Sequence, residues 1–158
     1  AKEILLLDDI ALEASNSTSL ENKVNSLSLD SSSPYLTWVS TAKQMTYVFQ
    51  GSKNQWKLIK ELPCSTGKSG HDTPLGVFST NGDKDTWFYN YNYNDGAKYW
   101  TRIDGVYLFH SIPFAIDQVT IKDPILGEPR SHGCVRLTVE DAKWIYDNIS
   151  KGTTVVVR

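Results

Sequence analysis

The sequence predicts a mostly β domain with one helix near its C-terminus. Short runs rich in β-branched and aromatic residues recur from residue 35 onward, and turns containing glycine, asparagine or proline separate them. One late stretch, residues 138–149, instead spaces its apolar residues at helical intervals behind a capping threonine. The chain has 158 residues, which is enough for one domain with its own hydrophobic core.

Residues 1–33 differ in composition from the rest of the chain. The segment from Ile4 to Leu12 is patterned as a short amphipathic helix. Residues 16–33 are rich in serine and asparagine, with isolated leucine and valine residues and no aromatic residue. Because such a composition buries little apolar surface, it predicts a linker or tail. The predicted organisation is therefore an N-terminal tail or linker over residues 1–33 and a folded domain over residues 34–158.

The folded domain is predicted to open with a β-meander. Residues 35–39, 44–49 and 55–62 have the composition of strands, and residues 51–54 form a turn between the last two. The stretch from Thr73 to Phe78 is then expected to be a turn that runs into another strand.

The second half of the predicted domain combines aromatic strands with a long connection. Residues 87–93 alternate aromatic and polar side chains, Asn94-Asp95-Gly96 is a strong turn signal, and short strands follow at 98–103 and 106–110. The aromatic residues suit core and cross-strand packing, with a flap over a substrate as the alternative. Residues 111–130 contain three prolines and predict a long loop, a type of loop that often covers a binding site.

The chain is predicted to close with a helix and a strand. Thr138 is expected to cap the helix with Asp141 at the reciprocal position, and the helix is expected to end near Gly152. A last strand is expected over residues 153–157. The helix residues expected to face inward are Ala142, Ile145, Tyr146 and Ile149.

Composition and charge exclude several classes of function. The net charge of −2 gives no reason to expect nucleic acid or an anionic membrane as a partner. No apolar run approaches the roughly 18 residues that a membrane-spanning helix needs. A monomer is the default expectation. The chain begins at Ala1 rather than methionine, so we expect it to be processed or trimmed at its N-terminus.

The two cysteines, Cys64 and Cys134, have different expected roles. A disulfide between them would remove the thiolate that a nucleophile needs, so both are predicted to be free. Cys64, between Pro63 and Ser65, is interpreted as a small buried apolar residue.

Cys134 lies in the run Ser131-His132-Gly133-Cys134, which has the features of a nucleophile loop. A thiol has a pKa of about 8.5, so a nucleophilic cysteine needs a base or a positive environment. His132 is two residues away and seldom reaches a collinear hydrogen bond from that position. His110 comes from a different predicted strand and can approach the sulfur across the sheet, so we favour His110 as the base. Gly133 lets a substrate approach closely and allows successive backbone N–H groups to stabilise an oxyanion.

The segments Phe109-His110-Ser111 and Ser131-His132-Gly133-Cys134-Val135-Arg136-Leu137 together resemble the signature of the L,D-transpeptidase catalytic domain of bacterial cell-wall enzymes. Two further stretches are similar to the same family, Ser65 to Phe78 with its Thr73-Pro74-Leu75-Gly76 turn and Asp141 to Val155. The resemblance covers about residues 35–158. It implies a β-sandwich or barrel-like catalytic fold with a long active-site loop and one C-terminal helix.

The resemblance also implies a mechanism. Cys134 would attack the bond between the third, L-configured residue of a peptidoglycan stem tetrapeptide and the D-alanine that follows it. An amine of a second stem would then resolve the thioester into a 3→3 cross-link. His110 would act as base and acid, with its other ring nitrogen held by the carbonyl group of Ser111. The N–H groups of Gly133 and Cys134, together with His132, would form the oxyanion hole.

The resemblance assigns supporting roles to two further residues and a cellular place to the protein. Ser131 would support the loop, and Arg136 would bind a substrate carboxylate or brace the loop. If the aromatic run forms a flap over the cysteine, Tyr99 would add a hydroxyl to the oxyanion hole. A surface salt bridge is the alternative for Arg136, and His71 is expected to be a solvated loop residue. The implied location is the bacterial cell wall or surface, outside the cytoplasm, and the implied inhibitors are carbapenems.

Alternatives to transpeptidation remain open from the sequence. Hydrolysis of the same thioester would give an L,D-carboxypeptidase, and a silent site would give a non-catalytic wall-binding module. A sortase-type ligase also uses histidine, cysteine and arginine, but its cysteine follows a different motif. His110, His132 and Cys134 are zinc-ligand types, yet no second cysteine or carboxylate lies at ligand spacing. We therefore predict no metal and no cofactor.

Overall fold

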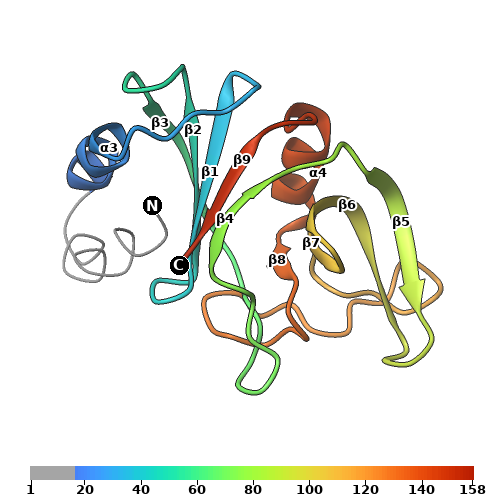
Figure 1. Cartoon of the computed structure of the whole chain (residues 1–158). Helices are drawn as coiled ribbons and strands as arrows, with labels where there is room; N and C mark the ends of the chain where they lie inside the picture. The colour runs from blue at the N-terminus through green and yellow to red at the C-terminus, as the bar shows by residue number, and fades with distance from the viewer. Residues whose placement is uncertain (1–16) are drawn as a thin grey trace.

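The computed structural model describes residues 17–158 and contains two β-sheets, each with a helix packed against it (Figure 1). In spatial order, the first sheet consists of β3 (Lys57–Pro63), β2 (Met45–Gln50), β1 (Tyr35–Ser40), β9 (Thr154–Val157) and β4 (Gly76–Ser79). The second sheet consists of β5 (Lys84–Asn90), β6 (Asp95–Asp104), β7 (Tyr107–Ser111) and β8 (Val135–Leu137). The prediction of a mostly β fold is confirmed.

The main core lies between the two sheets. It joins Val39 and Val155 of the first sheet to Phe109 and Leu137 of the second, and Cys64 is among its fully buried members. The central pair β1 and β9 runs parallel, with Trp38 opposite Val156, and is buried along almost its whole length. Parallel strands covered on both faces require continuous apolar sequence, which explains the valine run at the end of the chain.

Helix α4 (Val139–Asn148) closes this core beside the second sheet. The hydroxyl of Thr138 accepts a hydrogen bond from the Asp141 N–H at 3.0 Å, so the predicted N-cap is confirmed. Ala142, Ile145 and Ile149 are buried as expected, whereas the predicted inward residue Tyr146 is half-buried.

A second helix, α3 (Ser17–Ser26), packs against the opposite face of the first sheet. Leu20 and Val24 are buried there with Trp38 of β1, and the indole N–H of Trp56 donates to the Leu29 carbonyl group at 2.9 Å. Composition predicted that residues 1–33 form a linker that buries little surface. Residues 17–33 differ, because a few leucine and valine residues at helical spacing suffice to cover tryptophans that the sheet exposes. The helix predicted between Ile4 and Leu12 lies outside the described residues.

Two features of the second sheet bring the predicted site residues together. Strands β5 and β6 form an antiparallel hairpin, with Trp87 opposite Lys98. Strands β7 and β8 run parallel, with His110 opposite Arg136, and the long connection of residues 112–134 joins them. Because the parallel register sets Val135, the first residue of β8, opposite Phe109 in the middle of β7, Cys134 is delivered next to the strand that carries His110. Within residues 17–158, no helix is long and apolar enough to cross a lipid bilayer.

Candidate active site

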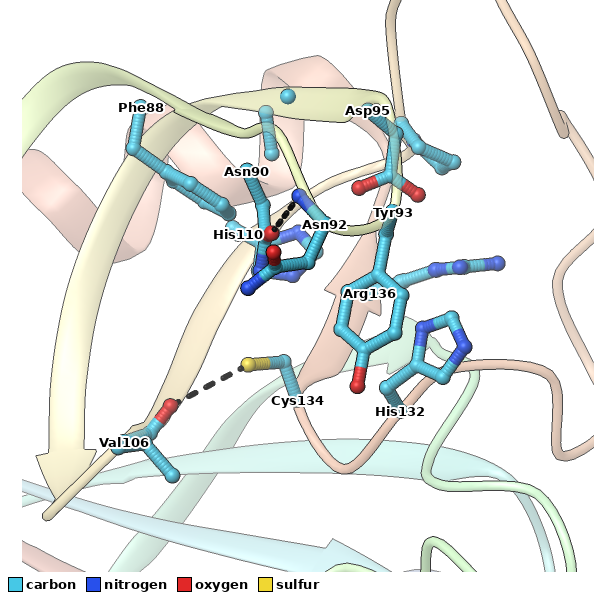
Figure 2. Close-up of a pocket in the computed structure, with 13 residues that line it drawn as sticks. Phe88, Asn90, Asn92, Tyr93, Asp95, Val106, His110, His132, Cys134 and Arg136 are labelled. Carbon is cyan, nitrogen blue, oxygen red and sulfur yellow. Dashed lines mark hydrogen bonds between the residues drawn. The ribbon is translucent and has the colours of Figure 1, made fainter.

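A cavity of about 310 Å³ opens on the second sheet between the β5–β6 hairpin and the loop that ends at Cys134 (Figure 2). Its walls combine hairpin residues with the end of β7 and the start of β8. The lining residues are Phe88, Asn90, Asn92, Tyr93, Asp95, Gly96, Ala97, Val106, His110, Pro113, His132, Cys134 and Arg136. The structure thus brings four of the predicted site residues to one cavity, namely His110, His132, Cys134 and Arg136.

Cys134 directly precedes the first residue of β8, and its side chain is half-buried. Its Sγ approaches the Val106 carbonyl oxygen at 3.6 Å, and both cysteines of the chain are free. Burial raises the pKa of the Cys134 thiol to about 11, and a backbone hydrogen bond from Leu108 and the charge of Arg136 offset only part of that effect. At neutral pH the thiol is therefore protonated and needs a base.

His110 provides a neutral imidazole on the neighbouring strand. Its Nδ1 lies 2.6 Å from the Ser111 carbonyl oxygen, the contact that the family resemblance implies. Since a carbonyl oxygen can only accept, Nδ1 carries the proton and Nε2 keeps its lone pair. The ring is only 7% exposed, and burial lowers the pKa of His110 to about 4. The resting pair is a neutral thiol and a neutral base rather than a preformed ion pair.

His132 forms part of the cavity wall. Its ring stacks on Tyr93 of the hairpin loop, with centroids 3.7 Å apart and planes within 3° (Figure 2). The ring of His71 meets it at a steep angle, with centroids 5.0 Å apart. Burial lowers the pKa of His132, and the nearby charges of Lys68 and His71 add to this. Within the described chain neither His132 nor His110 makes a hydrogen bond to Cys134, whose Sγ approaches the Val106 carbonyl oxygen. His71 is exposed, as expected for a loop residue.

The cysteine loop has a backbone that only glycine fits. Gly133 has a φ of 131°, and a Cβ atom there would lie 2.7 Å from Cε1 of Tyr107. Ser131 Oγ donates to the Cys134 carbonyl oxygen at 2.5 Å and accepts from the Gly133 N–H at 3.1 Å. The Gly133 N–H, expected to face an oxyanion, is therefore engaged inside the loop. Among residues 17–158, the N–H groups of His132 and Cys134 have no such partner.

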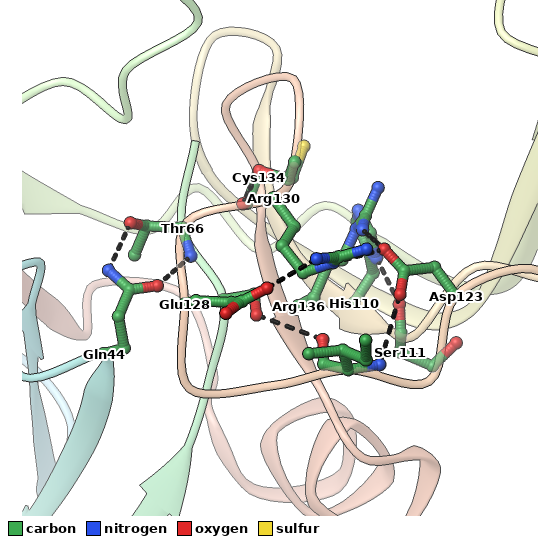
Figure 3. Close-up of polar contacts among 12 residues, drawn as sticks. Gln44, Thr66, His110, Ser111, Asp123, Glu128, Arg130, Cys134 and Arg136 are labelled. Atoms are coloured by element: carbon green, nitrogen blue, oxygen red, sulfur yellow. Dashed lines mark hydrogen bonds and ion pairs between the residues drawn. The ribbon is translucent and has the colours of Figure 1, made fainter. Parts of the chain in front are cut away.

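Arg136 braces the long connection through an ion-pair network (Figure 3). Its Nη1 lies 3.1 Å from Asp123 Oδ2, and the same oxygen lies 2.7 Å from Arg130 Nε. Arg136 is only 6% exposed, and its Nε has no hydrogen-bond partner in the described structure. Of the roles considered for Arg136, bracing the loop matches these contacts, and a surface salt bridge does not.

Sequence reasoning missed two acidic residues of the site. Asp123 is one of three acidic residues in the long connection, where no periodic pattern distinguishes it. Asp95 was interpreted only as part of a turn, yet its carboxylate lines the cavity and makes no hydrogen bond within residues 17–158. Burial raises the pKa of Asp95, and the charges of Arg136 and Lys122 partly oppose that rise.

Tyr99, predicted to contribute to the oxyanion hole, does not line the cavity. Its ring packs against the main core and lies 5.5 Å from that of Tyr146 on α4. The cause is a left-handed backbone at Tyr99, with a φ of 51°, which interrupts the alternation of side chains along β6. In the described part of the chain, no three side chains of the histidine, cysteine, aspartate or glutamate types gather as a metal site would require.

Comparisons with known proteins show what the chain is similar to. Residues 34–157 match the family model of the L,D-transpeptidase catalytic domain. YciB of Bacillus subtilis (strain 168), an L,D-transpeptidase by name, is 37% identical over 123 residues, which are 75% of this chain and 63% of YciB. L,D-transpeptidase 1 of Mycobacterium tuberculosis is 27% identical over 132 residues, which are 75% of this chain and 49% of that protein. The chain thus spans less than two thirds of the length of these relatives.

Two solved structures illustrate the similarity of fold. A Clostridium acetobutylicum protein, described as a fused Zn-dependent amidase, peptidase and peptidoglycan-binding domain-containing protein, has a TM-score of 0.73 and 35% identity over 95% of this chain and 62% of its own. LdtMt1, an LD transpeptidase in complex with imipenem, has a TM-score of 0.63 and 21% identity over 79% of this chain and 59% of its own.

Proposed function

Because this chain belongs to the L,D-transpeptidase catalytic domain family, we propose that it is a cysteine acyltransferase acting on peptidoglycan stem tetrapeptides. It attacks the bond between the third, L-configured residue and the D-alanine at the fourth position, and passes the acyl group to an amine of a second stem, forming a 3→3 cross-link. The observation that carries the proposal is that Cys134 and His110 line one cavity, with His110 Nδ1 fixed on the Ser111 carbonyl group.

Acylation begins with two neutral groups. His110 Nε2 takes the thiol proton while Cys134 Sγ bonds to the carbonyl carbon of the third residue, and an oxyanion forms. Collapse of this intermediate breaks the C–N bond, and His110 returns the proton to the departing amine of D-alanine. The free N–H groups of Cys134 and His132 suit the oxyanion, since donors of this kind act without reorganisation.

Transfer of the acyl group reverses the roles. The acceptor amine bonds to the thioester carbon, His110 takes the amine proton, and the thiolate leaves and is reprotonated. Asp95 supports this step, because an unpaired carboxylate in the cavity wall attracts an incoming ammonium group, which gives one proton to solvent before the neutral amine attacks. In this proposal the partners of the protein are stem peptides, one as acyl donor and one as acceptor. The protein works outside the cytoplasm at the cell wall. It acts as a monomer and without a cofactor.

Intact-mass measurement after exposure to a carbapenem tests the nucleophile. The wild-type protein is expected to gain the mass of one inhibitor and Cys134→Ala to gain none. An unmodified wild-type protein that still binds wall fragments would favour a non-catalytic wall-binding module.

Incubation with a stem tetrapeptide tests the fate of the acyl group. Cross-linked dimers with release of D-alanine are the expected products. Tripeptide alone would favour an L,D-carboxypeptidase, in which water resolves the thioester.

A further inference from the structure

The segment that contains the Thr73-Pro74 turn lies directly against the cysteine loop. Ser65 exchanges two backbone hydrogen bonds with Arg136, at 3.0 and 2.8 Å, and the Lys68 N–H donates to the Ser131 carbonyl group at 2.9 Å. Gln44, in the turn between β1 and β2, pairs with Thr66 through both ends of its side-chain amide, at 2.8 and 2.9 Å (Figure 3). This segment therefore connects the first sheet to the loop that carries Cys134.

Thr73 bonds to the residue that directly precedes the nucleophile. Its side chain is only 4% exposed, and its hydroxyl accepts from the Gly67 N–H at 2.9 Å and donates to the Gly133 carbonyl oxygen at 2.7 Å. Because the Gly67 N–H can only donate and the Gly133 carbonyl can only accept, the direction of both bonds is fixed. The hydroxyl has a single proton, and that proton is committed to Gly133.

The bond to Gly133 determines where the Cys134 N–H points. The Gly133–Cys134 peptide is trans and planar, so its C=O and N–H groups point in opposite directions. With the carbonyl oxygen held by Thr73, the Cys134 N–H faces away from Thr73 and finds no partner among residues 17–158. The Gly133 N–H is engaged by Ser131 Oγ at 3.1 Å, so it competes poorly for the same role.

Glycine makes this peptide orientation easy to lose. The φ of 131° at Gly133 lies in a region that other residues rarely adopt, and glycine itself has access to several alternatives. Without a contact on its carbonyl oxygen, the 133–134 peptide is free to rotate about its flanking bonds. The hydroxyl of Thr73 supplies that contact from a segment anchored elsewhere.

We propose that Thr73 is a positioning residue for acyl transfer: its hydroxyl holds the Gly133 carbonyl group so that the Cys134 N–H serves as the oxyanion donor. Thr73 does not touch the substrate and acts through the 133–134 peptide. The proposal rests on the acylation of Cys134 proposed above. It gives the Thr-Pro turn a part in the chemistry, where its sequence predicts only a turn before a strand.

Thr80 offers a matched control. It is 3% exposed, its hydroxyl donates to the Ser150 carbonyl group at 2.8 Å, and it accepts from the Thr153 N–H at 3.1 Å. Thr73→Val and Thr80→Val therefore each delete one donated and one accepted hydrogen bond. Thr73→Val deletes them beside the nucleophile loop, and Thr80→Val deletes them beside β9. Thr73→Ser keeps the hydroxyl and removes only a methyl group.

The experiment measures acylation by a stem tetrapeptide together with denaturant unfolding of each variant. Thr73→Val is expected to lower kcat by ~10- to 100-fold with KM nearly unchanged, because a misaligned donor fails in the transition state and not in the ground state. Thr73→Ser is expected to stay within about threefold of wild type, and Thr80→Val to lose stability like Thr73→Val without the loss of kcat. Thr73→Val at the wild-type rate, or an equal loss of kcat in Thr80→Val, would overturn the proposal.

A second measurement separates this proposal from the proposed function. The amide nitrogen and proton resonances of Cys134 are expected to shift in Thr73→Val and to stay in place in Thr80→Val and Thr73→Ser. If the wild-type protein forms no acyl-enzyme, the proposed function fails while this measurement still shows whether Thr73 orients the peptide. Unchanged Cys134 resonances in Thr73→Val would refute that orientation directly.

Discussion

Cys64 and Cys134 occupy two regions of the molecule that are held together in different ways. Cys64 is 0% exposed in the apolar core between the sheets, and burial raises the pKa of its thiol to about 12. Cys134 borders a cavity whose walls are held by hydrogen bonds and ion pairs, and burial raises the pKa of its thiol to about 11. Burial thus raises the pKa of both thiols above the usual value.

Access and partners therefore distinguish the nucleophile, and a lowered pKa does not. Within residues 17–158, Cys64 is enclosed in the apolar core and does not line the cavity. Cys134 lines that cavity together with the buried His110, and within the same residues the N–H groups of His132 and Cys134 are unpaired. A search for acidic thiols alone would not have separated the two residues.

Removing each sulfur in turn gives the largest expected difference between the regions. Cys134→Ala is expected to abolish carbapenem acylation and stem-peptide turnover, because the remaining thiol, Cys64, is fully buried away from the cavity. Cys64→Ala is expected to keep its turnover and to lose roughly 1 kcal/mol of unfolding free energy, the usual result of removing a small buried group. Intact mass, product analysis and urea unfolding measure these effects. Turnover in Cys134→Ala would contradict the assignment of the nucleophile.

A comparison of His110 with His71 tests whether a base in the cavity distinguishes the region of Cys134. His110→Ala is expected to lower the acylation rate by ~10²- to 10⁴-fold, since it removes the base that a protonated thiol needs. His71→Ala, at an exposed position outside the cavity lining, is the control and is expected to stay near the wild-type rate. Single-turnover acylation followed by mass spectrometry compares them. Similar losses in both variants would mean that the base has been assigned to the wrong histidine.

Much of this arrangement was predictable, and the misses share a physical cause. The strands, the Thr138 cap and the neighbourhood of Cys134 and His110 follow from local patterns, because apolar periodicity, capping and a rare motif are written in consecutive residues. Helix α3 was missed because it is stabilised by packing against Trp38 and Trp56, which lie far from the helix in the sequence. Tyr99 packs against the core and does not line the cavity, because its own left-handed backbone inside β6 breaks the period of two. Asp123 gains its role only when the chain brings two arginines to it.

The pH dependence of acylation tests the neutral pair. Acylation needs the unprotonated ring of His110, whose pKa is lowered to about 4, so the rate is expected to hold steady from neutral pH down to well below pH 6.5 and to fall only toward pH 4. The sign follows from protonation, since adding a proton to Nε2 removes the base. Carbapenem acylation rates across this range provide the measurement. A fall centred at or above pH 6.5 would indicate an ordinary, solvated histidine as the base.

The pH dependence of the unfolding free energy should reflect the same lowered pKa of His110. His110 binds its proton at about pH 4 in the folded state and near 6.5 when unfolded, so the unfolded state holds more protons between these values. The contribution of His110 to stability is therefore complete above pH 6.5 and declines as the pH falls toward 4. Urea unfolding of wild type and of His110→Ala across this window is expected to show a smaller decline in the variant. An equal decline in both would mean that other groups cause it.

The smallest expected effect concerns the polar contacts around Cys134. Asp123 pairs with Arg130 at 2.7 Å and with the buried Arg136 at 3.1 Å, whereas Glu128 pairs with Arg130 at 2.5 Å from a largely exposed position. Asp123→Asn leaves the charge of Arg136 without its partner inside the protein and is expected to cost about 1–3 kcal/mol of unfolding free energy.

Glu128→Gln is the matched control, and an exposed pair of this kind contributes about 1 kcal/mol or less. If urea unfolding gives equal losses for the two variants, the pairing of Asp123 with the buried arginine does not hold the loop. If Asp123→Asn also slows carbapenem acylation while Glu128→Gln does not, the ion pairs hold the cavity in its reactive shape. Among the described residues, no ion pair adjoins Cys64, where the packing of the apolar core surrounds the thiol.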